Sequence, residues 1–358
     1  MDRMDRSNPV LVTGGAGFIG SALVRHLVRE TEREVVTVDC LTYAGHRSSL
    51  GIAQESPRHT FEEVDIRDAG GVKRVFREHD PDAVVHLAAE SHVDRSIDGP
   101  AAFLKTNVDG TYVILEAALD HYRSLNGRRQ DEFRFLHVST DEVYGEAAPG
   151  EEFSEQTSYS PNSPYAASKA AADHLVRAWG KTYGLPVLTT NCSNNYGPYQ
   201  FPEKLIPHIT LSALEGRDLP VYGDGRQVRD WLFVRDHVRA LMTVLRAAGP
   251  GSYFNIGGDA ERENIEIVRG ICDILDDLYP RPDGRSYRKQ ITFVEDRPGH
   301  DRRYAVDASR ISSELGWRPT TDLDSGLRAT VRWYLENEDW WRPIRDRDYE
   351  GERLGRLP

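Results

Sequence analysis

Short apolar runs alternate with amphipathic helical patterns through the first two-thirds of the chain, and this alternation restricts the possible folds more than any other feature. A strand that is apolar on both faces must be covered on both faces, which favours a parallel sheet between two layers of helices. We expect strands at residues 10–12, 34–38, 60–64, 83–87, 133–138 and 186–190, and helices at 18–29, 107–122 and 166–183. The sequence therefore predicts an α/β fold with a doubly wound parallel sheet.

The bulk composition excludes several kinds of partner. The 358 residues carry a formal net charge of −12, with a pI near 5.5, so the surface repels nucleic acid and anionic membranes. The cysteines at positions 40, 192 and 272 form no CxxC pair, and such a sparse, odd count is typical of a reducing cytoplasm, where we expect the protein. Residues 1–8 lack the apolar segment of a signal peptide, and no run of eighteen apolar residues predicts a transmembrane helix.

A glycine-rich turn, TGGAGFIG at residues 13–20, joins the first strand to the first helix. Gly14, Gly17 and Gly20 permit a tight turn and a close approach of the backbone to a pyrophosphate, which the amides of the helix N-terminus then face. This turn predicts a dinucleotide site and makes the expected sheet one of the Rossmann type. A glycine-rich turn that binds no ligand is the alternative.

The ends of the next three strands supply further candidates for the cofactor site. Asp39 follows the glycines by about twenty residues, where a carboxylate accepts bonds from the ribose hydroxyls and repels a 2′-phosphate, so we expect NAD rather than NADP. Asp65, followed by Ile66, is either an adenine contact or a helix N-cap. The end of the fourth strand leaves room for a flat cofactor because it is formed by Leu87, Ala88 and Ala89.

After about residue 190 the composition shifts toward proline, glycine and aromatic residues, which indicates a second, smaller part of the protein. We predict a cofactor-binding domain from residues 1–190 plus about 230–256. A smaller α/β substrate-binding domain would comprise about 191–229 plus 257–358. From Trp340 onward the chain is polar and rich in arginine, so we expect this tail to be loosely held.

Two segments carry the groups that could react. STDEVYG at 139–145 follows the apolar fifth strand, and YAASK at 165–169 places Tyr165 and Lys169 one helical turn apart. Lys169 and a nicotinamide ring would lower the pKa of the Tyr165 phenol, so that it could accept a hydroxyl proton while hydride leaves the same carbon. The alternative for Tyr165 is a half-buried packing residue.

Asp141 and Glu142 are adjacent, so their side chains diverge and could act on neighbouring carbons. One carboxyl would protonate a leaving hydroxide and the other would accept a carbon-bound proton, with burial and mutual repulsion separating their pKa values. This pair indicates elimination of water in addition to hydride transfer. A solvated turn after the strand is the alternative.

Lys204, Arg229, Arg297 and His300 are candidates for binding an anionic ligand, although a lone arginine is more often a solvated surface residue. His86 and His92 could suggest a metal, but a third ligand is not evident, and we assign no metal site.

Together these motifs resemble the extended short-chain dehydrogenase/reductase superfamily and, within it, the dTDP-glucose 4,6-dehydratases. TGGAGFIG and YAASK mark the superfamily, whereas STDEVYG is more specific. The related 4-epimerases lack an acidic pair there, and decarboxylases and GDP-mannose dehydratases keep the Glu but not the Asp. The resemblance runs from about Val10 to Trp317, and its further motifs are DCLTYAG at 39–45, HLAAESHVDRSI at 86–97, SNNYGPYQFPEKLIP at 193–207 and DRPGHDRRYAVD at 296–307.

The resemblance implies a role for each matching residue. Thr140 would bind the sugar 4-hydroxyl and Tyr165 would be the base there, Asp141 the acid at C6 and Glu142 the base at C5. The NAD site would comprise Gly14, Gly17, Phe18, Ile19, Gly20, Asp39, Cys40, Leu41, Thr42, Ala44, Gly45, Asp65, Ile66, Leu87, Ala88, Ala89, Thr106, Tyr165, Lys169 and Asn195. The nucleotide-sugar pocket would comprise Ser91, Thr140, Asn194, Lys204, Leu205, Pro220, Tyr222, Arg229, Asn255, Arg297 and His300.

The implied reaction converts dTDP-glucose into dTDP-4-keto-6-deoxyglucose without net redox change, and the implied assembly is a homodimer through helices 107–122 and 166–183. Cys40 and His46–Arg47 depart from the family pattern beside the adenosine end of the cofactor. A nucleotide-sugar 4-epimerase or decarboxylase is the alternative enzyme. A catalytically inert NAD-binding regulatory protein is the alternative of another class.

Overall fold

The computed structural model describes residues 8–297, 299–347 and 349. A seven-stranded sheet forms the larger part of the molecule, with the order β10-β6-β5-β4-β1-β2-β3 and with every pair parallel. Its strands are β1 (Val10–Thr13), β2 (Val35–Asp39), β3 (His59–Glu63), β4 (Ala83–His86), β5 (Arg134–Thr140), β6 (Val187–Cys192) and β10 (Tyr253–Ile256). The predicted Rossmann-type sheet is confirmed.

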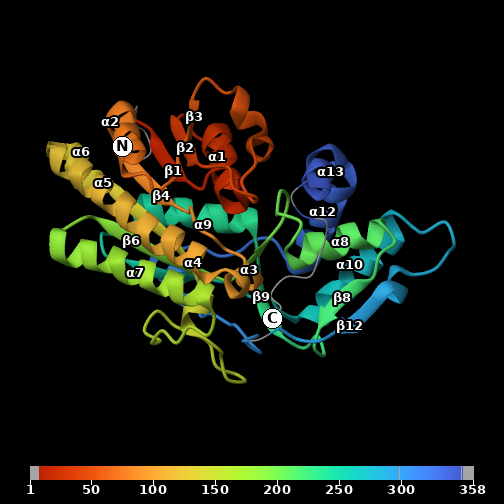
Figure 1. Cartoon of the computed structure of the whole chain (residues 1–358). Coiled ribbons are helices and arrows are strands. Elements are labelled where there is room, and N and C mark those ends of the chain that lie inside the picture. The colour runs from red at the N-terminus through yellow and green to blue at the C-terminus, as the bar shows by residue number, and fades with distance from the viewer. Residues whose placement is uncertain (1–7, 298, 348, 350–358) are drawn as a thin grey trace.

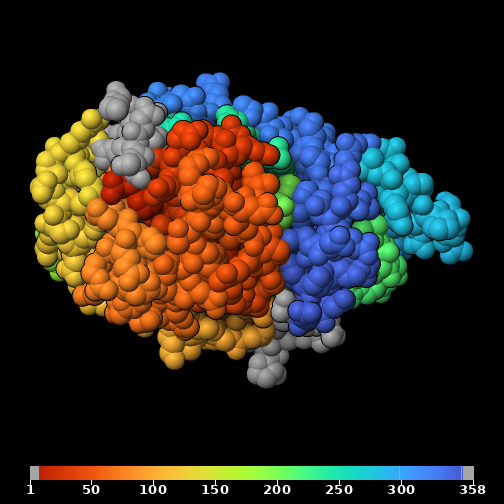
Figure 2. Space-filling model, turned by 90° about the horizontal axis from the view of Figure 1, so that it is seen from above, coloured from red at the N-terminus to blue at the C-terminus, as the bar shows by residue number. Residues whose placement is uncertain are grey.

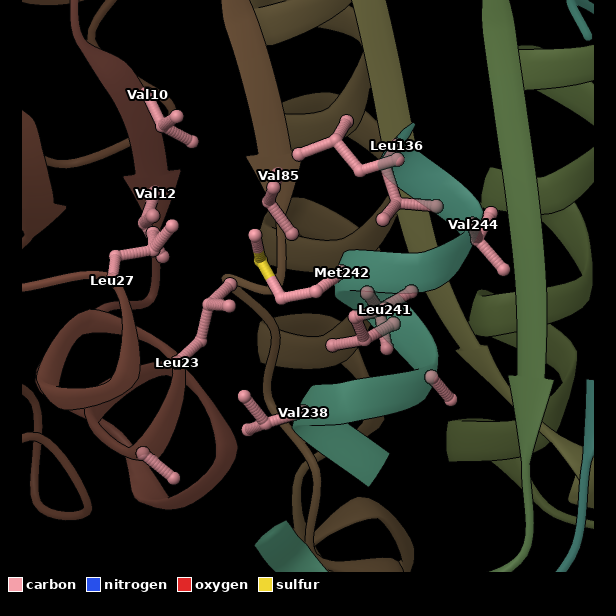
Figure 3. Close-up of a cluster of buried hydrophobic side chains, with 14 of the residues drawn as sticks. Val10, Val12, Leu23, Leu27, Val85, Leu136, Val238, Leu241, Met242 and Val244 are labelled. Atoms are coloured by element: carbon pink, nitrogen blue, oxygen red, sulfur yellow. The ribbon is translucent and has the colours of Figure 1, made fainter. Parts of the chain in front are cut away.

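Helices cover both faces of this sheet, as the doubly apolar strands require (Figure 1). One face packs against α1 (Phe18–Glu30) and α9 (Val234–Ala247), and the other against α2 (Ala69–His79), α5 (Thr111–Ser124) and α7 (Pro164–Tyr183). Figure 3 shows the first of these layers, where Val10 and Val12 of β1 lie with Leu23 of α1 and Met242 of α9. Leu11, between the two valines, points into the opposite layer.

Each expected strand is present, with ends that differ by one or two residues, and β10 is a strand that the sequence did not predict. The helix expected at 107–122 begins as a π-helical segment, η2 (Leu104–Gly110), before α5. α7 starts where its sequence favours it, because Ser163 accepts a bond from the Ala166 amide and Pro164 occupies the first turn. Asp65 is not a helix N-cap, since Asp68 caps α2.

A second, smaller lobe holds the substrate-side elements (Figure 1, right). Its sheets have the strand orders β11-β9-β7 and β12-β8. A separate apolar core lies between these strands and three helices. The elements are β7 (Asn194–Tyr196), α8 (Leu205–Leu214), β8 (Leu219–Tyr222), β9 (Val228–Phe233), β11 (Glu261–Glu263), α10 (Asn264–Leu278), β12 (Ile291–Val294) and α12 (Leu323–Glu336). α9 and β10 return the chain to the large sheet between β9 and β11.

The remaining short elements are η1 (Arg47–Glu55), α3 (Val93–Asp98), α4 (Pro100–Phe103), α6 (Gly127–Glu132), η3 (Asp141–Tyr144), η4 (Tyr287–Gln290) and α11 (Ser309–Leu315). Within the described part of the chain, no helix has both the length and the apolar character needed to cross a membrane. The prediction made for residues 1–7 lies outside the described residues.

The expectation of a loosely held tail is wrong for residues 340–347, which belong to α13 (Glu338–Arg347). Trp341 is buried and its indole donates to Tyr334 O at 2.7 Å, while the Trp340 indole donates to Ser49 Oγ at 3.3 Å. Aromatic side chains thus anchor a segment whose charges suggested exposure. Figure 2 shows the C-terminal part of the chain in blue beside the red and orange N-terminal part.

Candidate active site

The glycine-rich turn brings the start of α1 against the ends of β1 and β4. Gly14 has a φ of +68°, and a Cβ there would lie 2.7 Å from Ala88 Cα. A Cβ on Gly20 would lie 2.1 Å from Gly14 O, so a larger residue would push the helix off the turn. Glycine is therefore required for the close packing that shapes the adjoining cavity.

A cavity of about 340 Å³ lies at the carboxyl ends of the central strands, where open parallel sheets bind their ligands. With one exception, every residue predicted for the NAD site lines it. Leu41 is the exception: its backbone has a φ of +52° and its amide donates to Asp39 Oδ1 at 2.9 Å. Asp39 Oδ2 accepts from the Ala16 amide at 2.9 Å, so this carboxylate also ties β2 to the glycine-rich turn.

Asp65 lies on the wall of the same cavity. Its carboxylate accepts bonds from both the backbone and the side chain of Arg67, and the side-chain bond is the main reason its pKa is lowered. Asp65 is therefore an anion at the rim, and its contact with adenine stays a prediction.

Thr140, Asp141, Glu142, Tyr165 and Lys169 all line this cavity, so the structure brings together the groups that the sequence singled out. Asp141 is 1% exposed; its Oδ1 accepts from Thr140 Oγ1 at 3.3 Å and its buried Oδ2 has no hydrogen-bond partner among the described residues. Burial, then the Glu142 charge, hold the pKa of Asp141 well above its ordinary value. This carboxyl is suited to carry a proton at neutral pH.

Glu142 has a different environment. Burial raises its pKa as well, but Arg297, Lys204 and Arg229 oppose that effect with three positive charges. The cations therefore favour the ionised form of Glu142. Asp141 is itself favoured in its protonated form, because burial and the Glu142 charge raise its pKa. The arrangement supplies an acid and a base on consecutive residues.

The expectation that Lys169 and the nicotinamide ring together lower the pKa of Tyr165 stays a prediction, because in the isolated chain that pKa is raised. Burial, followed by the Glu142 charge, raises the phenol's pKa well above its ordinary value, and a hydrogen bond with Thr140 opposes this. Lys169 Nζ donates to the Val138 carbonyl at 2.9 Å.

A second cavity, of about 230 Å³, opens beside the first on the side of the small lobe. Glu142, Asn194, Glu203 and Lys204 line both cavities, so the reacting carboxylate lies where the two meet. Most of the predicted nucleotide-sugar residues line the second cavity, namely Asn194, Lys204, Leu205, Pro220, Tyr222, Arg229, Arg297 and His300; Ser91 and Thr140 line the first.

Asn255 lies on neither cavity wall. It is fully buried on β10, where its Oδ1 accepts from Tyr144 OH and its Nδ2 donates to Phe153 O, both at 2.8 Å. Asn264, the first residue of α10, is an asparagine that does line the second cavity. Substrate binding by Asn255 stays a prediction, but its amide is already engaged by the protein.

The structure also shows a positioning residue that sequence reasoning missed. Asp94 Oδ1 forms a partly buried ion pair with Arg297, and Asp94 Oδ2 accepts from Tyr222 OH at 3.3 Å. One carboxylate therefore orients two side chains of the second cavity. The signal available in the sequence was the position of Asp94 within the segment HVDRSI.

The histidines considered as metal ligands have other partners. Both ring nitrogens of His86 bond to threonine hydroxyls, at 2.7 Å to Thr13 and 3.0 Å to Thr111. Elsewhere, Glu62, Glu78 and His79 place their ligand atoms close together at the surface, but Arg74 already pairs with both glutamates.

The parallel sheet, the glycine-rich turn and the Tyr165–Lys169 pair define a short-chain dehydrogenase/reductase of the extended type. A family model described as GDP-mannose 4,6 dehydratase matches residues 11–330. A dTDP-glucose 4,6-dehydratase of Shigella flexneri is 57% identical over 350 residues, which cover 95% of this chain and 96% of the relative. The chain belongs to the dTDP-glucose 4,6-dehydratase family.

Solved structures agree with this assignment. A dTDP-glucose 4,6-dehydratase from Streptomyces venezuelae, determined with NAD and a second ligand bound, superposes with a TM-score of 0.86 at 45% identity, covering 94% of this chain and 99% of that one. A UDP-glucose 4-epimerase from Thermus thermophilus, with NAD, gives a TM-score of 0.81 at 30% identity, covering 92% and 99%. The epimerase therefore shares the fold of this chain.

Proposed function

We propose that this protein catalyses the NAD-dependent dehydration of dTDP-glucose to dTDP-4-keto-6-deoxyglucose. The observation that carries the proposal is the position of Asp141, Glu142 and Tyr165 on the wall of the first cavity, with Glu142 also lining the second. A hydride carrier in the first cavity and a sugar entering from the second would meet at these three residues.

In the first step, Tyr165 accepts the proton of the sugar 4-hydroxyl, which Thr140 orients through its own hydroxyl. NAD supplies the acceptor for the C4 hydride and later returns that hydride to C6. Burial raises the pKa of the free phenol. Lys169 and the positive nicotinamide ring of bound NAD would lower it again, which would make Tyr165 a better base.

The second step uses the acidic pair. The C4 ketone acidifies the proton on C5, which Glu142 removes as a carboxylate supported by Arg297, Lys204 and Arg229. Asp141 donates its proton to the departing C6 hydroxyl, in keeping with a pKa held well above the ordinary value by burial. The same cations give the second cavity the charge needed to bind a diphosphate, although the chain as a whole is acidic.

We further infer that residues 1–190 plus about 230–256 form the NAD-binding domain, and that about 191–229 plus 257–358 form the nucleotide-sugar-binding domain. The homodimer implied by the resemblance is supported by exposed apolar residues near and on α5 and α7: Leu104 is 54% exposed, Tyr112 47% and Tyr183 46%. Light scattering should then give twice the 40.4 kDa mass of one chain.

The free thiols of Cys40, Cys192 and Cys272 suit a cytoplasmic location.

A direct assay tests the proposed function. Purified protein with NAD and dTDP-glucose should yield a product that develops the 4-keto sugar chromophore in alkali, with no net accumulation of NADH. Stoichiometric NADH would indicate an ordinary dehydrogenase, and a dTDP-galactose product an epimerase. Glu142→Gln should abolish the chromophore, whereas Glu146→Gln, at an exposed neighbouring position outside both cavity walls, should not.

A further inference from the structure

A buried network of hydrogen bonds converges on Asp173, one helical turn after Lys169 on α7. Asp173 Oδ1 bonds to His137 Nε2 at 2.9 Å, and Oδ2 accepts from Ser139 Oγ and Tyr159 OH, both at 2.8 Å. His137 and Ser139 lie on β5, the strand that ends at Thr140. The carboxylate thus fastens the helix that carries Tyr165 and Lys169 to the strand that leads into the acidic pair.

The network continues beyond Tyr159 to other elements around the site. Tyr159 OH and Tyr144 OH each bond to Tyr253 OH at 2.7 Å, and Tyr144 OH also donates to Asn255 Oδ1 at 2.8 Å. Tyr144 belongs to η3, which begins with Asp141, and Tyr253 belongs to β10. Asp173 is the anionic end of this chain of hydroxyls.

Lys169 needs a nearby negative charge because its ammonium is buried, with 5% of the residue exposed. Its Nζ donates to one backbone carbonyl, Val138 O. Burial lowers the pKa of Lys169, and the charge of Asp173 is the first influence that opposes this. The other titratable groups around Lys169 are Tyr165 on the same helix, His86 on β4, His137 on β5 and Cys192 on β6.

We propose that Asp173 is a positioning residue for the reaction: it is the buried counter-charge of Lys169 and fixes α7 against β5. Residues i and i+4 are neighbours on one helix face, so Lys169 and Asp173 project from the same side of α7 toward β5, where they bond to Val138 O and to Ser139 Oγ respectively. The importance of this role for turnover rests on the proposed function, because Lys169 serves the base Tyr165. The charge relation between the two side chains does not depend on the substrate.

Asp173→Asn tests the proposal, because an amide of the same shape can still bond to His137, Ser139 or Tyr159 but carries no charge. We expect turnover to fall about tenfold at pH 9, on the order of what one lost neighbouring charge produces, and to approach the wild-type rate near pH 6. Lys169 would lose its proton at lower pH in the variant, so the alkaline limb of the pH–rate profile should move down. Tyr159→Phe is the matched control, since it removes one bond to Asp173 without removing charge and should leave the profile in place.

A second measurement follows Lys169 itself. The chain has six lysines, at positions 73, 105, 169, 181, 204 and 289, so ε-¹³C-lysine spectra are simple enough to assign with a Lys169→Arg variant. The Lys169 signal should titrate at lower pH in Asp173→Asn than in the wild type. An unshifted titration together with an equal loss of activity at all pH values would show that Asp173 is purely structural and overturn the proposal.

The two readouts separate this inference from the proposed function. If the wild-type protein failed to convert dTDP-glucose, the proposed function would be wrong, yet the lysine titration would still decide the role of Asp173. If Asp173→Asn did not fold, the wild-type spectrum would decide, because a Lys169 signal of a neutral amine at pH 8 contradicts a counter-charge beside it.

Discussion

Replacing Asp141 by Asn should lower the catalytic rate while it raises the stability of the fold. The amide keeps the shape of the carboxyl but cannot donate a proton to the departing hydroxide. Loss of one general acid costs about 10²- to 10⁴-fold in rate, or roughly 3–5 kcal/mol of barrier. Oxidation at C4 uses Tyr165 and should continue, so single-turnover experiments should show NADH and the 4-keto glucose intermediate accumulating together.

The same substitution should raise stability, and more so as the pH rises. Asp141 has a folded-state pKa above its unfolded value because it is buried beside Glu142. The contribution of Asp141 to stability is therefore fully present below the ordinary pKa of 3.8 and is lost as the pH rises toward the folded pKa, at up to about 1.4 kcal/mol per pH unit. Asn binds no titrating proton and avoids this loss.

Melting temperatures of the two proteins between pH 4 and pH 8 measure this difference, and rapid-quench analysis of the sugar measures the chemistry. The melting temperature of the variant minus that of the wild type should increase with pH. A difference that stayed constant, or that shrank with rising pH, would mean that Asp141 is not a protonated buried acid. Equal slowing of oxidation and elimination would assign Asp141 to binding or folding.

Three further results are expected. Purified protein should carry NAD and bind NADP at least about tenfold more weakly, because the Asp39 carboxylate repels a 2′-phosphate; equal affinity in calorimetry would contradict the role of Asp39. Tyr165→Phe should slow hydride transfer by about 10²- to 10⁴-fold while calorimetry shows unchanged dTDP binding, and near-normal turnover would remove Tyr165 from the mechanism. Asp94→Asn should weaken dTDP binding about tenfold, since Arg297 and Tyr222 lose their anchor; unchanged affinity would show that Asp94 does not position them.

The large sheet could be predicted because local sequence reports its main physical constraint. Strands apolar on both faces and a glycine-rich turn point to one architecture, and Gly14 and Gly20 have the close contacts that their positions required. β10 escaped prediction because four residues that follow a turn carry too little periodic signal. α13 escaped because its burial depends on Trp340 and Trp341 finding partners far along the chain.

In the candidate site, too, residues within contiguous motifs could be predicted, whereas partners distant in sequence could not. Residues in contiguous motifs, such as Asp141 and Tyr165, were identified correctly as cavity residues. Long-range partners were not, because the roles of Asp94 and Asp173 arise from contacts with segments distant in sequence. Burial, the main influence on the pKa of the Tyr165 phenol in the isolated chain, was likewise not visible in its local sequence.

The fate of one deuterium tests the central claim most directly. dTDP-glucose labelled at C4 is converted in ordinary water, and mass spectrometry with proton NMR locates the label. If Tyr165 and NAD oxidise C4 and the pair Asp141–Glu142 then eliminates water, the deuteron should appear in the C6 methyl group, and C5 should gain a proton from solvent. Label returned to C4, retained on released NADH or left unmoved would contradict the dehydratase mechanism.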